Sequence, residues 1–485
     1  MNKPLRRVAI FCGLLMVALM VRSNWIQFAQ GDELRNDPKN RRVAIERYAQ
    51  PRGNIIVDGK AVTGSKATEG TDFKYKRTYK NGEIWAPVTG YASQAFGATQ
   101  LEAIYDGILT GDDDRLFFNQ TIDMFTGEDQ KGGNVVTTLD ADVQKAGFET
   151  MGDKKGAAVA INPETGAILG LVSTPSYDPS SFAGNSSKDA EKWNSLLKDE
   201  DEPMLNRALR QTYPPGSTFK VVTAAAALES GMYDIDEKTD TPDPYRLPQS
   251  TTDLGNDGNH PCEDASLRVA MQWSCNTVFA KISDELGNEK MIEYSERFGF
   301  NQEHFVPVRA AESVYPEDNR PQNAMAGIGQ ASNRATPLQM AMVAAAVAND
   351  GKMMEPYMMD QLIAPGLNVV EEHKPREMGE VASAENAQKL QQMMETVVEK
   401  GTGVPAQIDG VTVGGKTGTA QHGENNEKNP YAWFISYAKT SDGSTPIAVA
   451  VVVESADVLR DDIAGSKLAA PVAKAMMEAA LDGRR

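Results

Sequence analysis

The sequence predicts an α/β protein whose main part is a mainly antiparallel sheet flanked by helices. Three apolar runs near the C-terminus, with short connections between them, predict consecutive antiparallel strands at 411–421, 431–438 and 445–455. The turn NPETG separates two more apolar runs and predicts a hairpin at 155–177. Strands at both ends of a region that holds long helices, such as 336–350, are typical of an α/β domain.

The 485 residues are too many for one ordinary domain, and we divide them into three regions. The first, 1–30, is an N-terminal anchor. The second, 31–150, is a smaller β-rich α+β pedestal, and the third, 151–485, is the main domain. In the pedestal we expect strands at 53–59 and 83–91, a helix at 98–111, and a strand followed by a helix at 134–151.

The N-terminus has the pattern of a membrane segment. Lys3, Arg6 and Arg7 precede an apolar run from Val8 to Val21, and Trp25 follows. The run has the length of a signal-peptide core, but no small-x-small cleavage site follows it. Basic residues suit the cytoplasmic side and tryptophan suits the lipid–water boundary. The sequence therefore favours an uncleaved anchor with the rest of the chain outside the cytoplasm; a cleaved signal peptide and a buried helix are the alternatives.

Charge and cysteine content limit the partners. A formal net charge of −18 argues against a nucleic-acid partner, which would require a basic surface. Cys262 and Cys275 lie in the external part, 13 positions apart, and either form a disulfide or are two separate buried thiols. Neither a Gly-x-Ser-x-Gly nor a His-Glu-x-x-His pattern surrounds any of the four histidines, so we expect no metal and no cofactor.

The stretch YPPGSTFK carries the first chemical signal. Its prolines and glycine predict a helix start, and the apolar run 221–229 predicts that the helix is buried. If the helix begins at Ser217, Lys220 lies on the same face. Burial lowers the pKa of a lysine and makes it a candidate base for a serine nucleophile. The alternative is a serine cap beside an unrelated lysine, since Ser-x-x-Lys also begins at Ser195 and Ser436.

Two further motifs follow in order, and each occurs once: Ser274-Cys275-Asn276 and Lys416-Thr417-Gly418. The first follows an apolar segment and suits a helix that ends in a loop at a cleft; an ordinary turn is the alternative. The second lies in a predicted strand, where Lys416 and the hydroxyls of Thr417 and Thr419 are suited to hold a carboxylate while a peptide pairs along the strand. A glycine-rich strand end is the alternative.

These three motifs, with their neighbouring blocks, resemble the class B penicillin-binding proteins, in particular their short monofunctional type. The resemblance extends over nearly the whole chain and implies the penicillin-binding/transpeptidase fold. Cys275 departs from the pattern, because Ser or Asp is more usual there. The blocks that carry the resemblance are 47–59, 89–111, 157–179, 205–220, 326–341 and 414–421.

The resemblance also implies roles. Ser217 would be the acylated nucleophile and Lys220 its base, while Ser274 would relay a proton to the leaving amine. Asn276 would hold the substrate amide and orient Lys220, and Lys416 would supply positive potential. The substrate carboxylate would bind at Thr417, Gly418 and Thr419, and the oxyanion hole would be the backbone N–H groups of Ser217 and Thr419.

The family's reaction implies the partners. The expected activity is peptidoglycan D,D-transpeptidation, in which stem peptides ending in D-Ala-D-Ala are cross-linked and β-lactams trap the nucleophile. Cell-division or elongation proteins are expected to bind the pedestal, and the membrane holds the anchor. A D,D-carboxypeptidase or β-lactamase-type hydrolase, and a catalytically silent cell-division scaffold, are the competing functions.

Overall fold

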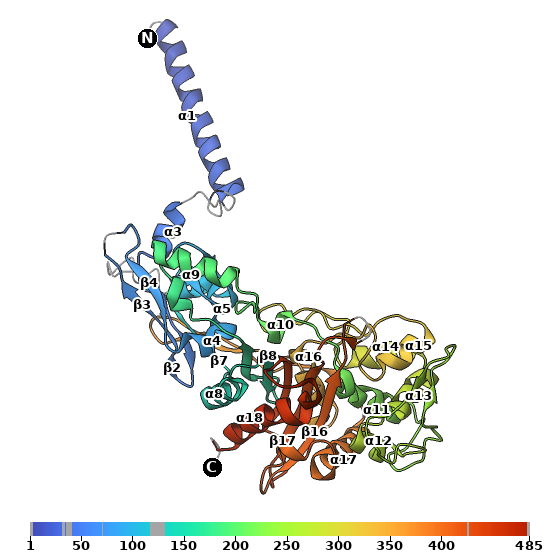
Figure 1. Cartoon of the computed structure of the whole chain (residues 1–485). Coiled ribbons are helices and arrows are strands. Elements are labelled where there is room, and N and C mark those ends of the chain that lie inside the picture. Colours follow the sequence, from blue (N-terminus) through green and yellow to red (C-terminus); the bar gives the residue numbers. More distant parts are fainter. Residues whose placement is uncertain are drawn as a thin grey trace.

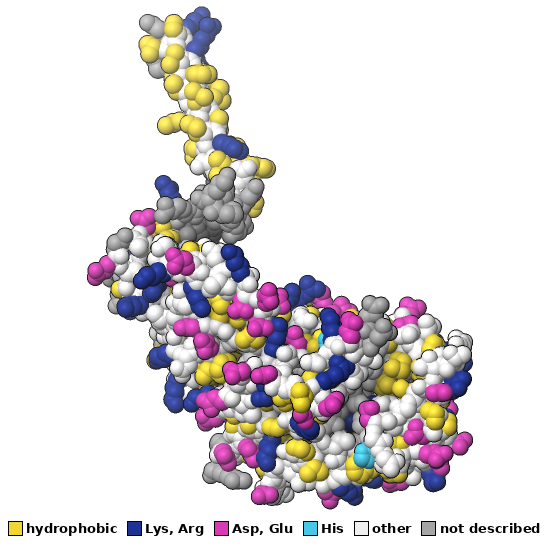
Figure 2. Space-filling view, in the orientation of Figure 1, with side chains coloured by type: hydrophobic (Ala, Val, Ile, Leu, Met, Phe, Trp, Pro, Cys, Tyr) yellow, Lys and Arg dark blue, Asp and Glu magenta, His cyan; other side chains and the backbone are white. Residues whose placement is uncertain are grey.

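The computed structural model describes residues 3–31, 34, 41–69, 71–116, 131–423 and 426–482. Helix α1 (Lys3–Ala29) stands apart from the rest of the chain, and none of its residues is buried (Figure 1). Hydrophobic side chains cover its surface and basic side chains lie at its tip (Figure 2). In the described ranges it is the one helix that is long and apolar enough to cross a membrane.

The main sheet has five strands in the order β16-β17-β18-β8-β9, and every neighbouring pair is antiparallel. The predicted hairpin and the three predicted C-terminal strands are confirmed. The pairing of β18 with β8 joins the two ends of the region, for example Val451 opposite Ala158. The strands are β8 (Lys155–Ile161), β9 (Ile168–Thr174), β16 (Thr412–Ala420), β17 (Tyr431–Lys439) and β18 (Ile447–Ser455).

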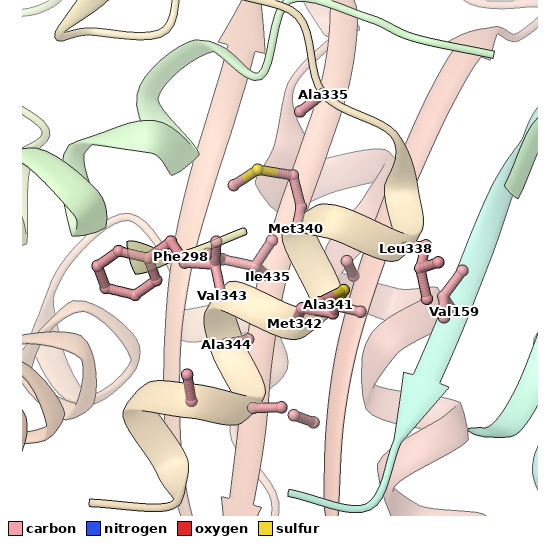
Figure 3. Close-up of a cluster of buried hydrophobic side chains, with 14 of the residues drawn as sticks. Val159, Phe298, Ala335, Leu338, Met340, Ala341, Met342, Val343, Ala344 and Ile435 are labelled. Atoms are coloured by element: carbon pink, nitrogen blue, oxygen red, sulfur yellow. The ribbon is translucent and has the colours of Figure 1, made fainter. Parts of the chain in front are cut away.

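Helices cover both faces of this sheet. Because alternate residues of a strand point to opposite faces, Phe434 packs in the cluster of α8 (Ala141–Met151) and α18 (Ala470–Asp482), whereas Ile435 packs in the cluster of α16 (Pro337–Ala348). Every residue of α16 is buried, as its apolar composition on all sides predicts. Figure 3 shows α16 lying across the strands, with Leu338 beside Val159.

A helical region lies beside the edge strand β16 (Figure 1). It contains α11 (Lys220–Glu229), α12 (Leu267–Trp273), α13 (Asn276–Leu286), α14 (Asn288–Arg297), α15 (Arg320–Ala326) and α17 (Ala384–Lys400). The remaining elements of the main region are η2 (Pro179–Phe182), α9 (Ser187–Leu197), α10 (Arg207–Arg210), η3 (Gly216–Phe219), β10 (Tyr245–Arg246), β11 (Asp253–Leu254), β12 (Lys352–Met354), β15 (Glu377–Glu380), η4 (Val404–Ala406), η6 (Arg460–Asp462) and η7 (Gly465–Ala469).

A second five-stranded sheet, in the order β14-β13-β7-β1-β2, takes strands from both sides of residue 150. Its strands are β1 (Ile55–Val57), β2 (Lys60–Ala61), β7 (Asn134–Thr137), β13 (Met359–Ile363) and β14 (Val369–Glu372). Strand β7 pairs parallel with β1 and antiparallel with β13. Helix α8 begins before residue 150 and yet packs on the main sheet, so the chain crosses between the two regions more than once.

Two expectations for the pedestal differ from the structure. Residues 83–91, predicted as a strand, form helix α4 (Gly82–Thr89), which buries Trp85 and Val88 at helical spacing and ends at Gly90 with φ of 66°. The single helix expected at 98–111 is two, because Tyr105 leaves helical geometry between them. The remaining elements are α3 (Arg41–Arg47), β3 (Thr63–Ala67), β4 (Tyr75–Tyr79), β5 (Ala92–Ser93), β6 (Gly97–Ala98), α5 (Gln100–Ile104), α6 (Asp106–Thr110) and η1 (Asp114–Leu116).

A buried ion cluster holds the pedestal together. Glu102 Oε2 lies 3.0 Å from Arg52 Nη2, and Glu102 Oε1 lies 2.5 Å from Arg77 Nε. Arg77 Nη1 also donates to the Gly53 carbonyl at 2.7 Å. Burial raises the pKa of the Glu102 carboxyl, but the two guanidiniums outweigh burial and hold that pKa below its usual value. The cluster therefore depends on all three charged groups being present.

Candidate active site

Ser217 lies in the tight turn η3, and helix α11 begins at Lys220, three residues later than the predicted start. The turn is fixed from two sides. Gly216 N donates to the Gly329 carbonyl at 2.9 Å, and Trp433 Nε1 of strand β17 donates to the Pro214 carbonyl at 3.0 Å. Gly216 has φ of 54°, a conformation that favours glycine. Ser217 is half-buried at the junction of this turn and the sheet edge.

Lys220 contacts the second motif. Its Nζ donates to the Ser274 carbonyl at 2.7 Å, to Asn276 Oδ1 at 2.7 Å and to Ser274 Oγ at 3.3 Å. Three oxygens of the second motif therefore lie within hydrogen-bonding distance of this one amine. Among the described residues no hydrogen bond joins Lys220 to Ser217, although the helical spacing predicts that the two are neighbours.

Ser274 turns the chain between two helices. It follows α12 and has φ of 61° and ψ of 41°, a left-handed conformation that is uncommon outside glycine. Helix α13 then begins at Asn276. This sharp turn brings the carbonyl and hydroxyl of Ser274 and the side chain of Asn276 to the same lysine. The sequence predicted the end of a helix here but not the backbone conformation.

Lys416 joins the third motif to the second. Its Nζ lies 2.8 Å from Ser274 Oγ and 2.9 Å from the Thr417 carbonyl. In the register of β16 with β17, Lys416 is opposite Ile435 and therefore lies on the face that packs on the helical region. Thr417 lies on the other face, where its Oγ1 is 2.6 Å from Thr402 Oγ1. The side chains of Lys416 and Thr417 therefore lie on opposite faces of the edge strand β16.

The backbone of Thr419 faces the open edge of the sheet. In the amide orientation that satisfies both groups, the side chain of Gln330 pairs with the backbone N–H and C=O of Gln421, at 3.3 and 3.2 Å. The Thr417 carbonyl also points away from β17, since Lys416 Nζ donates to it. Residues two apart in a strand direct their backbone groups to the same side. Thr419 therefore directs its N–H and C=O to the edge between these two contacts.

Burial controls the charge of both lysines, which are fully buried. Burial lowers the pKa of Lys220 well below its usual value, the charge of Lys416 lowers it further, and the carboxylate of Asp257 opposes both. Burial lowers the pKa of Lys416 to about 7. A neutral amine is therefore accessible near neutral pH, which is the condition for accepting a proton from a hydroxyl.

The loop before α12 is attached to the second motif at several points. Cys262 and Cys275 form a disulfide, and the rings of His260 and Trp273 stack 4.2 Å apart. From the same loop, Asn256 contacts the start of α13. Outside the loop, Thr402 contacts Thr417 of the third motif. The sequence analysis identified neither Asn256 nor Thr402. The paired cysteines were the one sequence signal for this loop. No motif marks the asparagine or the threonine.

The other candidates lie elsewhere. Ser195 is exposed on α9, and Ser436 is buried within strand β17. His422, which is near Lys416 in the sequence, stacks on Tyr431 with the ring centroids 4.0 Å apart, and its Nε2 donates to the Asn429 carbonyl at 2.7 Å. Within the described part of the chain no group of three or more metal-ligating side chains forms a metal site.

Comparisons with known proteins identify the family. Residues 156–478 match the penicillin binding protein transpeptidase domain, and residues 52–135 match the penicillin binding protein A dimerisation domain. The chain is 39% identical over 493 residues to peptidoglycan D,D-transpeptidase PbpA of Mycolicibacterium smegmatis, covering 99% of each chain. It is 40% identical to PbpA of Mycobacterium tuberculosis, covering 100% of each.

Solved structures show the same fold. Penicillin-binding protein A of M. tuberculosis, as an acyl-enzyme with ceftriaxone, superposes with a TM-score of 0.85 at 39% identity, over 90% of this chain and 100% of that chain. Its penicillin G acyl-enzyme superposes with a TM-score of 0.82 at 38% identity, over 89% and 100%. The family resemblance and the fold predicted from the sequence are confirmed.

Proposed function

This chain belongs to the penicillin-binding protein transpeptidase family, and from that premise we propose which of its residues carry out D,D-transpeptidation of peptidoglycan stem peptides. Ser217 Oγ attacks the carbonyl carbon of the penultimate D-alanine, and the terminal D-alanine leaves with a proton on its amine. The amine of a neighbouring stem then attacks the ester, which forms the cross-link and returns a proton to Ser217. The site needs a base, a proton relay and an oxyanion hole.

Neutral Lys220 is the base in this scheme. Its burial and lowered pKa support that role. The Ser274 carbonyl and Asn276 Oδ1 hold Nζ in place, and binding of a substrate is expected to bring Ser217 Oγ into reach, since catalytic hydrogen bonds often tighten only in the complex. Asn276 Nδ2 remains able to bind the substrate amide.

The hydrogen-bonded chain from Lys220 through Ser274 to Lys416 is the observation that carries the proposal. Ser274 Oγ lies 3.3 Å from Lys220 Nζ and 2.8 Å from Lys416 Nζ, so one hydroxyl connects the three motifs. Such a hydroxyl can pass a proton from the base to the leaving amine. A silent scaffold has no need of this assembly, and the identity to named transpeptidases extends over the full chain.

Substrate binding is assigned to the edge of β16. Gly418 allows the turn η3 to approach, because a Cβ at 418 would lie 3.1 Å from Thr218 Cγ2 and 3.2 Å from the Pro215 carbonyl oxygen. The edge-facing N–H of Thr419 and the N–H of Ser217 are suited to bind an oxyanion. We assign the substrate carboxylate to Thr417, Gly418 and Thr419, beside the positive potential of Lys416.

β-Lactams are the second class of ligand in this proposal. The M. tuberculosis relatives form acyl-enzymes with ceftriaxone and penicillin G. A β-lactam presents its carbonyl and carboxylate as a D-Ala-D-Ala end does, so Ser217 Oγ attacks the lactam carbonyl and the ring nitrogen takes the proton. The ester that forms is the expected covalent adduct.

We also propose a single-pass topology, with α1 in the membrane and the catalytic region outside the cytoplasm. Lys3, Arg6 and Arg7 at one end of α1 and Trp25 near the other support this orientation. The division into 1–30, 31–150 and 151–485 belongs to the same proposal. The pedestal lies between α1 and the main sheet (Figure 1), where division or elongation proteins could bind without covering the site.

The decisive experiment labels the full-length protein in detergent with a fluorescent penicillin and locates the adduct by mass spectrometry. The adduct is expected on Ser217, S217A is expected to remain unlabelled, and S195A, which removes an exposed serine of the same pattern, is expected to label normally. An adduct on another residue would refute the assignment. Rapid hydrolysis of the adduct would favour the hydrolase, and growth restored by S217A in a deletion strain would favour the scaffold.

A further inference from the structure

We propose that Asn256 is a positioning residue for the second motif, which holds Asn276 against Lys220 from a loop that no catalytic motif includes. The inference rests on the proposed function, since it assumes that Lys220 is the base. Asn256 lies in the loop after β11, 20 positions before Asn276 in the sequence. Its amide contacts the first turn of α13 from outside the helix.

The backbone of α13 depends on this amide. Asn256 Oδ1 accepts from Asn276 N at 2.6 Å and from Thr277 N at 3.1 Å, and Asn256 Nδ2 donates to Thr277 Oγ1 at 3.0 Å. The first N–H groups of a helix have no partner within the helix, and the residue before α13, Cys275, supplies no side-chain cap. Asn256 therefore acts as the cap from a distant segment.

The side chain of Asn276 is held by the same loop. Its Nδ2 donates to the Gly255 carbonyl at 3.4 Å, and its Oδ1 accepts from Lys220 Nζ at 2.7 Å. The lysine sets which end of the amide faces it, because only the amide oxygen can accept from Nζ, and the Gly255 carbonyl accepts from the other end of the amide. The adjacent residues Gly255 and Asn256 thus hold the side chain and the backbone of Asn276.

A change in the position of Asn276 affects Lys220, because the two side chains are hydrogen-bonded. The charged groups that act on Lys220 are Lys416 on β16, which lowers its pKa, and Asp257, which raises it, while burial lowers it. Asp257 is the next residue after Asn256, so a negative charge introduced at 256 would lie in the same loop and act in the same direction. A shift in the pH dependence of acylation caused by a charge at position 256 would therefore show that this position acts on Lys220. A loss of stability alone would not show this.

The test measures acylation of the full-length protein in detergent by a fluorescent penicillin, separating the acylation rate constant from the initial binding constant, over a range of pH. N256A loses the cap, and we expect its acylation rate constant to fall about 10- to 100-fold with the binding constant little changed, as misplacement of a catalytic group does. N256D keeps the acceptor and adds a charge, and we expect the rise of its rate with pH to move to higher pH. N319A is the matched control, because Asn319 caps helix α15 through Gln322 N, as Asn256 caps α13.

The outcomes separate the two proposals. If wild-type protein is not acylated on Ser217, the proposed function fails. If wild-type is acylated and N256A acylates at the same rate, or N256D shows the wild-type pH profile, the positioning role is refuted. Should N256A fail to fold, as its thermal unfolding would reveal, N256D still decides, because its carboxylate can cap α13 as the amide does.

Discussion

Lys220 Nζ lies 2.7 Å from Asn276 Oδ1, although 56 positions of sequence separate the two residues. The contact places an amine, buried away from water, against an amide oxygen at the first residue of a helix. It explains how a lysine can be fixed in position while burial lowers its pKa. The predictions for the site follow from this pair and from its charged neighbours.

Replacing Lys220 by arginine tests the need for a neutral amine. Arginine cannot lose its proton in a protein, so K220R places a permanent cation at this position and has no base. We expect acylation by a fluorescent penicillin to fall by about 100- to 10,000-fold, the contribution typical of general base catalysis. The control is K198R, at an exposed lysine of another Ser-x-x-Lys pattern. Labelling of K220R at the wild-type rate would exclude Lys220 as the base.

Asp257 is predicted to set the pH dependence of acylation. Its carboxylate raises the pKa of Lys220, so D257N should lower that pKa, and the rise of the acylation rate with pH should move to lower pH. Because Asp257 is exposed and screened by solvent, we expect a shift of less than about one pH unit. D253N serves as control, because Asp253, in the strand β11 just before this loop, pairs with Arg246. A shift in the opposite direction, or none, would contradict the prediction.

Lys416 is predicted to make stability depend on pH. Its folded-state pKa is about 7, whereas an unfolded lysine titrates near about 10.4. Between these values the unfolded state binds more protons, so the free energy of unfolding of the wild type should rise with pH relative to K416M, by at most about 1.4 kcal/mol per pH unit. Chemical unfolding of both proteins at several pH values measures this difference. A difference that stays constant across the window would mean that Lys416 remains charged when buried.

Glu102 is predicted to be essential for the stability of the pedestal. E102Q removes the carboxylate that pairs with the buried guanidinium of Arg77 and leaves Arg52 paired with Asp106 alone, and breaking a buried pair in this way costs about 3–5 kcal/mol. The matched change E371Q removes an exposed carboxylate paired with Arg115, and we expect an effect within about 1 kcal/mol. Thermal unfolding compares the two. Equal losses of stability would show that the buried cluster contributes no more than a surface pair.

Helices and strands were predicted correctly where a segment showed a single hydrophobic pattern over its whole length. The apolar runs around NPETG and the three C-terminal runs form the strands predicted from them, and Asp140 caps α8 as a helix-start signal should. The strand prediction for 83–91 was wrong, because the apolar residues of this segment suit either a strand or a buried helix. Pro87, which lies inside α4, weighed against a strand because proline cannot donate to the sheet, and Gly90 was the helix-end signal.

By itself, the sequence determined the family, the three motifs and most of the elements that carry them, because motif spacing and apolar period are properties of short stretches of chain. Only the tertiary structure decided which oxygens surround Lys220, that β13 joins the sheet of β7, and that Asn256 caps α13. Those contacts join residues far apart in the chain. They are fixed by how the helices and sheets pack, and no local periodicity encodes that packing.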